Sequence, residues 1–392
     1  MIYYFNPGHE TAVKNASPYY TAPANIAAMQ NELSFLPAWY AAQNGIVLVN
    51  TINSNYFNYL NSILPILPKP ELAENLGNIK DSDISLWGIS PQAIYFMTEL
   101  SKKYDLKLNI PEWKEEYTYL NSRNAAKDCL REITNKISDI SKDIIPLFYS
   151  DLEDIEKAVN GSSHRLLSKA PYSSSGRGLL WLPESGLTRT ERQILHGTLK
   201  KQGSVSLERA LDKQIDFAME FLSDGKGNIT FAGYSLFYTN SKGGYEANYI
   251  GAQNNIEKLL TDKIPNNLLM EVKTNLESIL QGKYSHLYKG CIGVDMMIYK
   301  EGAYKLHPCV EINMRYNMGY LAIKLFENYI SPTSLGQFHI DFSAKEGEIQ
   351  RKHTEMQESF PIEFEKNKIK KGYLSLCPID EATHYRAYIQ IE

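Results

Sequence analysis

The segment 290–315 constrains the fold most strongly, because it places oxygen-bearing side chains inside two otherwise apolar strands. Asp295 interrupts the first apolar run, and Glu311 and Asn313 alternate with apolar residues in the second. Alternation puts Glu311 and Asn313 on one face of their strand. A turn at 300–302 joins the two runs, so antiparallel pairing can bring Asp295 beside them. Hydrophobic burial alone does not select such residues at strand positions.

Carboxylate and amide oxygens are the ligands that Mg²⁺ prefers, and a protein-bound Mg²⁺ commonly bridges to phosphate. Two carboxylates buried without a cation would be unfavourable, so a metal ion or basic partners must compensate them. The hairpin therefore predicts a Mg²⁺ site at Asp295, Glu311 and Asn313. The alternative is a structural polar network between Asp295, Arg315 and the end of a sheet.

Length and composition predict a globular protein of several lobes. The chain has 392 residues, of which 43% are hydrophobic and 22% charged, and this length exceeds what one hydrophobic core usually serves. We expect two or three packed lobes with a ligand-binding cleft between them.

Charge and apolar patterning exclude some partners. The formal net charge is -4, and no long Lys/Arg block is present, so nucleic acid is not an expected partner. The first residues lack the pattern of a signal peptide, and no apolar stretch is long enough to span a bilayer, so we expect a cytoplasmic protein without a membrane partner. The four scattered cysteines are expected to be small buried hydrophobes, and the oligomeric state stays open.

Element patterns divide the chain into four parts. In residues 1–120, apolar strands that end in polar loops alternate with helical stretches, which predicts a parallel α/β lobe. Residues 121–207 begin with a capped helix and continue with a strand, a small-residue loop and a second strand. Residues 208–330 predict an antiparallel sheet, to which we also assign the strand 204–208, together with a long packing helix. Residues 331–392 form a tail of unassigned role.

A lysine and a small-residue loop follow each other in the second part. Lys169 lies in a strand, and the loop 171–178 contains Ser173, Ser174, Ser175 and Gly176. A cation and a loop of backbone N–H donors are what a triphosphate requires. The loop is not a P-loop sequence, and protein-kinase signatures are absent, so the order of motifs carries the argument.

This order of motifs resembles the ATP-grasp superfamily. The resemblance covers roughly residues 121–328 and rests on Ser-Lys169-Ala-Pro, the Ser-Ser-Gly-Arg-Gly178 loop, Glu208, Gly290-x-x-Gly-Val-Asp295 and Glu311-Ile-Asn-Met-Arg315. It implies an α+β ATP-grasp fold within an α/β protein, in which an N-terminal pre-ATP-grasp lobe precedes two α+β subdomains that clasp a nucleotide. It also implies ATP and Mg²⁺ as cofactors.

The resemblance assigns roles to individual residues. Asp295, Glu311 and Asn313 would hold Mg²⁺, and Arg315 would contact the transferring phosphoryl group or an acyl phosphate. The residues that would contact the nucleotide are Lys169, Ser174, Ser175 and Gly176 at the phosphates, Glu208 and Leu211 at adenine, and Asp216 at the ribose.

The chain departs from the family pattern at two positions. The family usually has a second lysine near the start of the nucleotide-binding part, where this chain has Arg123, with Lys127 as the other option. Asp216 replaces the usual glutamate at the ribose position. We favour Arg123 as the second cation at the nucleotide.

Other polar and aromatic residues carry less specific expectations. His9 and Glu10, in the loop after the first strand, are expected either to bind substrate or to form a helix start with a solvent-facing histidine. His307 is expected to be structural because it precedes a proline. Trp39 and Trp87 are expected in the core.

The implied reaction joins a carboxylate to an amine or a similar nucleophile. In this superfamily a carboxylate attacks the γ-phosphate of ATP, and the nucleophile captures the acyl phosphate that forms. We therefore expect an ATP-dependent carboxylate-amine ligase acting on an unidentified small carboxylate or peptide. The alternatives are an ATP-grasp kinase that phosphorylates a small molecule, and a nucleotide-binding protein without catalytic activity.

Overall fold

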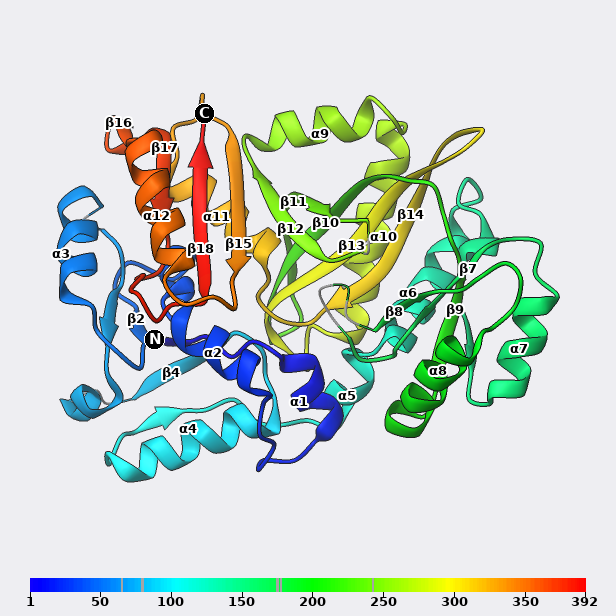
Figure 1. Cartoon of the computed structure of the whole chain (residues 1–392), viewed down its shortest axis with the longest axis horizontal. Helices are drawn as coiled ribbons and strands as arrows, with labels where there is room; N and C mark the ends of the chain where they lie inside the picture. The colour runs from blue at the N-terminus through cyan, green and yellow to red at the C-terminus, as the bar shows by residue number, and fades with distance from the viewer. Residues whose placement is uncertain (65, 79–80, 174–175, 177, 242) are drawn as a thin grey trace.

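The protein is described by a computed structural model that covers residues 1–64, 66–78, 81–173, 176, 178–241 and 243–392. Figure 1 shows a small lobe at one end, a large antiparallel sheet in the centre, and the N-terminal lobe beneath and beside that sheet. This arrangement confirms the predicted mixed α/β architecture.

The N-terminal lobe contains a parallel sheet in the order β3-β2-β1-β4-β5. Its strands alternate with helices or short 3₁₀ turns, as expected for parallel strands joined by crossovers. The strands are β1 (Ile2–Tyr4), β2 (Ile46–Leu48), β3 (Lys69–Glu71), β4 (Ser82–Leu86) and β5 (Leu108–Asn109). The helices are α1 (His9–Asn15), α2 (Ala24–Glu32), α3 (Ser54–Ile63), α4 (Pro91–Lys103) and α5 (Glu116–Leu120), with short 3₁₀ turns at Leu36–Trp39 and Ala73–Asn78.

The small lobe contains an antiparallel sheet in the order β6-β9-β7-β8. Its strands are β6 (Leu147–Tyr149), β7 (Leu166–Lys169), β8 (Leu179–Trp181) and β9 (Val205–Arg209), and its helices are α7 (Leu152–Asn160) and α8 (Arg189–Gln202). The predicted capping box at Thr188 and Glu191 is confirmed at the start of α8. An apolar core of its own holds this lobe together.

The central sheet has the strand order β14-β13-β10-β11-β12-β15-β18-β17-β16. Its strands are β10 (Lys213–Asp224), β11 (Ile229–Thr239), β12 (Tyr245–Ile250), β13 (Lys289–Glu301), β14 (Ala303–Asn313), β15 (Gly336–Phe342), β16 (Glu363–Glu365), β17 (Lys368–Ser375) and β18 (Tyr385–Ile391). The helices associated with it are α6 (Arg123–Lys136), α9 (Gln253–Thr261), α10 (Asn266–Lys283), α11 (Met318–Tyr329) and α12 (Glu348–Ser359), and a 3₁₀ turn spans Lys142–Ile144.

Two elements lie elsewhere than expected. The strand predicted at 204–208 was assigned to the large antiparallel sheet, and this assignment is wrong, because β9 pairs with β6 and β7 in the small sheet. Helix α6 packs against β14 rather than within the small lobe, because its apolar face, which includes Leu130 and Ile133, joins the core of the central sheet. The first strand of the small sheet is β6, and the domain boundary expected at residue 121 stays a prediction.

The C-terminal tail of unassigned role extends the central sheet. β15 pairs with β12, β18 pairs with β15, and β17 pairs with β18. Phe338 and Ile389, at paired positions of β15 and β18, are completely buried in a core that also contains Trp39. The tail is thus part of the folded body and reaches the lobe formed by the first residues of the chain.

Further expectations concern single residues and membrane segments. Trp39 and Trp87 are buried, as predicted, and all four cysteines are buried free thiols. Within the residues that the structure describes, no helix combines the length and apolar character needed to cross a membrane.

Helix α10 allows a test of the central core. Leu276 is completely buried on the face of α10 that packs on the sheet, whereas Met270 of the same helix is exposed. We expect Leu276→Ala to lower the free energy of unfolding by about 2–5 kcal/mol, because it removes buried methyl groups and leaves a cavity. Urea unfolding measures this, with Met270→Ala as the control expected within about 0.5 kcal/mol of wild type. Equal stability of the two variants would contradict the packing described for α10.

Candidate functional site: a cavity between three lobes

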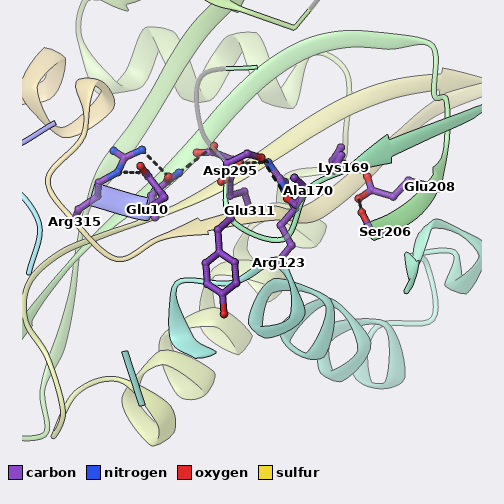
Figure 2. Close-up of polar contacts among 12 residues, drawn as sticks. Glu10, Arg123, Lys169, Ala170, Ser206, Glu208, Asp295, Glu311 and Arg315 are labelled. Atoms are coloured by element: carbon purple, nitrogen blue, oxygen red, sulfur yellow. Dashed lines mark hydrogen bonds and ion pairs between the residues drawn. The ribbon is translucent and has the colours of Figure 1, made fainter. Parts of the chain in front are cut away.

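A cavity of about 740 Å³ lies where the N-terminal lobe, the small lobe and the central sheet meet. Its lining includes Glu10 from α1, Lys169 from β7, and Asp295 and Glu311 from the hairpin β13–β14. Figure 2 shows the polar pairs in a row, with Arg315 and Glu10 at one end and Lys169 and Glu208 at the other. Asp295 and Glu311 lie between these ends.

The hairpin register brings the two carboxylates together. Asp295 of β13 is the direct cross-strand partner of Glu311 of β14, and Gly293 is the partner of Asn313. The ladder is irregular just beyond this point, where Met297 pairs with His307 and the extra residues of β14 include Pro308. Proline lacks an N–H to donate to a ladder, so an irregularity is where a sheet tolerates it. The predicted proximity of Asp295 to Glu311 and Asn313 is therefore confirmed.

The carboxylate pair has an excess of negative charge. Burial raises the pKa of Asp295 well above its usual range, and the neighbouring Glu311 and Glu220 raise it further. The donors that face the pair are Asn313 Nδ2, 3.1 Å from Asp295 Oδ2, and Arg123 Nη2, 2.9 Å from Glu311 Oε2. A cation bound at the pair would relieve this repulsion, so the two carboxylates have the chemistry of a Mg²⁺ site.

Asn313 is oriented differently from a metal ligand. Its amide nitrogen donates to Asp295, and its Oδ1 accepts from Arg315 Nη2 at 3.0 Å. Its amide would have to turn over before its oxygen could share a cation with Asp295. Within the described residues no cluster of three His, Cys, Asp or Glu side chains is suited to a metal, which leaves a two-carboxylate site as the one this hairpin offers.

Arg123 connects the carboxylate pair to the small lobe. Ser122 caps α6 by accepting from Ala125 N, which fixes Arg123 in the first turn of the helix. Arg123 Nε donates to Ala170 O at 3.1 Å while Nη2 bonds to Glu311. Lys127, the other candidate, lies one turn later with its ammonium 5.0 Å from the ring of Phe148. Arg123 lines the cavity and Lys127 is not among its lining residues.

Lys169 and Glu208 form a buried ion pair at the end of the cavity opposite Arg315. Lys169 Nζ lies 2.5 Å from Glu208 Oε2, and the two side chains are only 5% and 13% exposed. Burial acts to raise the pKa of Glu208, but Lys169 and Arg123 outweigh it, and the pKa lies below its ordinary value. Leu211 follows two residues after β9 and also lines the cavity. These residues thus lie together, as the motif order predicted.

Gly176, in the loop after β7, lies against the backbone of Gly243 and Gly244. Gly176 has a φ of 75°, and a Cβ at this position would lie 2.5 Å from Gly243 O. Only glycine combines this backbone conformation with so close an approach. Gly176, Gly243 and Gly244 all line the cavity. Ser174 and Ser175, predicted beside Gly176, lie outside the described residues.

Asp216 also lines the cavity, on the face of β10 that looks away from the core. Lys213 pairs with its carboxylate, and Thr239 Oγ1 donates to it at 2.8 Å. The side chain is therefore ordered by neighbours on two strands.

Arg315 and Glu10 connect the central sheet to the N-terminal lobe. Arg315 Nε lies 2.5 Å from Glu10 Oε1, and Arg315 Nη1 donates to Tyr316 O. Burial acts to raise the pKa of Glu10, but Arg315 and His9 outweigh it and lower the pKa to about 2, so Glu10 is ionised. His9 is 1% exposed and bonds to Asn121 Oδ1 through Nε2, so the expectation of a solvent-facing histidine is wrong. Its ring fits over Gly88, where a Cβ would lie 2.4 Å from it.

Glu220 is a buried acid that the sequence reasoning missed. It lies on the same face of β10 as Asp216, and both line the cavity, whereas Phe217, Met219 and Phe221, on the opposite face, are fully buried in the core. Ser235 Oγ and Asn317 Nδ2 donate to its two oxygens at 3.0 and 2.7 Å. Burial raises its pKa. The alternation of β10 was the available signal for its position.

His307 contributes to the cavity near Lys169 and Glu208. It is 4% exposed, and burial lowers its pKa to about 4, so the imidazole is neutral at pH 7. A buried neutral ring agrees with the expected structural role, although its position at the cavity was not expected.

Comparison with known proteins gives matches of structure alone. No protein-family model matches the chain, and no curated protein sequence matches it. The structure is similar to N5-carboxyaminoimidazole synthetase from Staphylococcus aureus complexed with ADP, with 12% identity, a TM-score of 0.50, and coverage of 92% of this chain and 91% of the other.

A second similar structure is a biotin carboxylase complex with a β,γ-ATP ligand from Campylobacter jejuni. It is 11% identical, with a TM-score of 0.52, and the match covers 100% of this chain and 87% of the other. An ADP complex of N5-carboxyaminoimidazole ribonucleotide synthetase matches with a TM-score of 0.50 at 10% identity, over 100% of this chain and 91% of the other. At sequence identities this low, the matches give information on the fold only. The fold that this chain shares with these structures is the ATP-grasp fold.

Proposed function

We propose that the protein is an ATP- and Mg²⁺-dependent ligase that joins a carboxylate to an amine or a similar nucleophile through an acyl phosphate. The observation that carries the proposal is the partly buried Asp295–Glu311 pair, flanked by Arg123 and Arg315 in a cavity between lobes. The fold, shared with structures solved in complex with ADP and an ATP analogue, supports the same conclusion.

The proposed nucleotide site runs from the small lobe to the hairpin. Lys169 and Arg123 supply positive charge for the phosphates, and the loop with Ser174, Ser175 and Gly176 supplies backbone donors. Glu208 and Leu211 face adenine, and Asp216 accepts from the ribose hydroxyls. The Lys169–Glu208 pair and the contact of Gly176 with Gly243 support this assignment, because both lie in the lining of one cavity.

Asp295 and Glu311 are the proposed holders of Mg²⁺, with Asn313 as a third ligand once its amide turns over. When bound, Mg²⁺ would neutralise phosphate charge and orient the triphosphate. Arg315 then fixes the carboxylate substrate and stabilises negative charge on the phosphoryl group, since phosphoryl transfer depends mainly on positioning and on charge stabilisation. Glu10 and Asn313 hold the guanidinium of Arg315 in place for this role.

The metal and nucleotide sites can be tested by ligand-dependent stability. Mg·ATP at about 100 times its Kd should stabilise the wild type by about 2.7 kcal/mol. We expect Glu311→Gln to lose most of this stabilisation, because it removes a charge while keeping the size of the side chain. Thermal unfolding with and without Mg·ATP measures the effect, and Glu363→Gln, at an exposed position of β16, serves as the control. An unresponsive wild type, or a fully responsive Glu311→Gln, would contradict the proposed site.

Variants of the Lys169–Glu208 ion pair can separate the contribution of Lys169 to stability from its proposed role in nucleotide binding. We expect Lys169→Met to lower the free energy of unfolding by about 3–5 kcal/mol, because it leaves the Glu208 carboxylate buried without its partner. The double variant Lys169→Met/Glu208→Leu should recover much of this stability and still fail to respond to Mg·ATP. Urea unfolding and thermal shifts with nucleotide measure both effects. Normal nucleotide binding by the stable double variant would refute the role proposed for Lys169.

Trapping can distinguish a ligase from a kinase. With Mg·ATP, an accepted carboxylate and hydroxylamine, a ligase should release ADP and form a hydroxamate, because hydroxylamine captures an acyl phosphate. The Glu311→Gln protein should form neither product. Colorimetric hydroxamate detection beside an ADP assay provides the readout. ADP release with a phosphorylated product and no hydroxamate would favour a small-molecule kinase instead.

A further inference from the structure

The half of the cavity that lies away from the proposed nucleotide site differs from it in chemical character. The strand order places β15 and β18 beyond β12, on the side of the sheet away from β13 and β14. In Figure 1 these strands and the N-terminal lobe lie at one side, and the small lobe lies at the other. The side chains that this half adds to the lining are mainly apolar: Phe5, Ile26, Met29, Ile340, Phe342 and Tyr385.

Phe342 is the most unusual member of this apolar wall. It ends β15 opposite Tyr385 of β18, with the two ring centroids 4.7 Å apart, and it remains 55% exposed. Large aromatic side chains gain free energy when a partner covers them, and exposed apolar surface that lines a cavity commonly marks a binding site.

The wall is attached firmly to the N-terminal lobe. Glu32, at the end of α2, accepts from the backbone N–H groups of His384 and Tyr385 at 2.9 and 2.6 Å. Met29 of the same helix contributes to the lining. The apolar wall is thus assembled from the two ends of the chain and held in one position before any ligand binds.

The acidic groups of this half are already paired. Glu10 binds Arg315, Asp341 binds Arg386, and Glu220 accepts from Ser235 and Asn317. An ammonium group would therefore meet carboxylates whose charge is already compensated by an arginine or by hydrogen-bond donors. Arg315 is different, because a guanidinium has five N–H donors and three bonds to protein acceptors account for three of them. Within the part of the chain that the structure describes, two of its N–H groups remain for a carboxylate.

We infer that this half of the cavity binds a carboxylic acid whose body beyond the carboxyl group is apolar and uncharged. Its carboxylate binds Arg315, next to the Asp295–Glu311 pair, and its aromatic or branched aliphatic body packs against Ile340, Phe342 and Tyr385. The inference rests on the proposed ligase function and specifies its carboxylate substrate.

Binding of simple acids tests this inference without turnover. The protein is loaded with Mg²⁺ and a non-hydrolysable ATP analogue, and acetate, succinate, phenylalanine and 3-phenylpropionate are titrated by calorimetry. We expect 3-phenylpropionate to bind about 10- to 100-fold more tightly than acetate, because its phenyl group is buried against the wall. Succinate and phenylalanine should bind more weakly than 3-phenylpropionate, because each brings a second charge to a wall whose described charged groups already compensate one another.

Variants of the wall provide the second arm. Phe342→Ala should weaken binding of 3-phenylpropionate about 10-fold and leave the affinities for acetate and for the nucleotide analogue unchanged. Phe364→Ala, which removes a partly exposed phenylalanine from the edge strand β16, is the matched control and should change none of them.

The results that would contradict the apolar subsite differ from those that would contradict the proposed ligase function. Equal binding of acetate and 3-phenylpropionate, or an unaffected Phe342→Ala protein, would overturn the apolar subsite while nucleotide binding stands. Tighter binding of phenylalanine or succinate than of 3-phenylpropionate would overturn it as well, because the site would then recognise a second charge. Failure of the wild type to bind the nucleotide analogue would instead refute the proposed function on which the inference rests.

Discussion

The arrangement of the cavity depends on two carboxylates held side by side on neighbouring strands. Asp295 and Glu311 are partly buried cross-strand partners in the hairpin β13–β14, and like charges at such positions repel each other. The surrounding structure compensates with arginines, and each arginine is anchored in a different lobe. Arg123 links Glu311 to Ala170 in the small lobe, and Arg315 links Asn313 to Glu10 in the N-terminal lobe.

This anchoring couples the charge of the hairpin to the position of the lobes. Any cation that neutralises Glu311 weakens its attraction for Arg123, and Arg123 also bonds to the backbone at the start of the glycine loop. The energy of such a contact is sensitive to burial, because a charge that loses its partner in a poorly solvated site is strongly unfavourable. The lobes are therefore connected through the same groups that would bind the ligands.

The sequence predicted the hairpin well because its information is local. Asp295, Glu311 and Asn313 lie within one pair of strands joined by a short turn, so alternation and pairing suffice to place them. The same applies to the capping box at Thr188 and to Lys169 before its loop. Local patterns could not assign β9, since its strand pattern fits either sheet and only tertiary pairing with β7 decides between them.

Residues that depend on distant contacts were harder to predict. His9 is buried because residue 88 is a glycine that leaves room for its ring, and nothing near His9 in the sequence indicates this. The alternation of side chains along β10 places Glu220 on the cavity face of that strand. Its partner Asn317, however, lies 97 residues later in the sequence, at the N-cap of α11. The proposed apolar subsite also depends on contacts between distant parts of the sequence. The wall that includes Met29 and Phe342 joins segments from opposite ends of the chain, whereas the proposed metal ligands lie in one hairpin. Under the proposed function, short motifs therefore predict the cofactor chemistry, while the substrate preference depends on tertiary contacts that only the folded chain brings together.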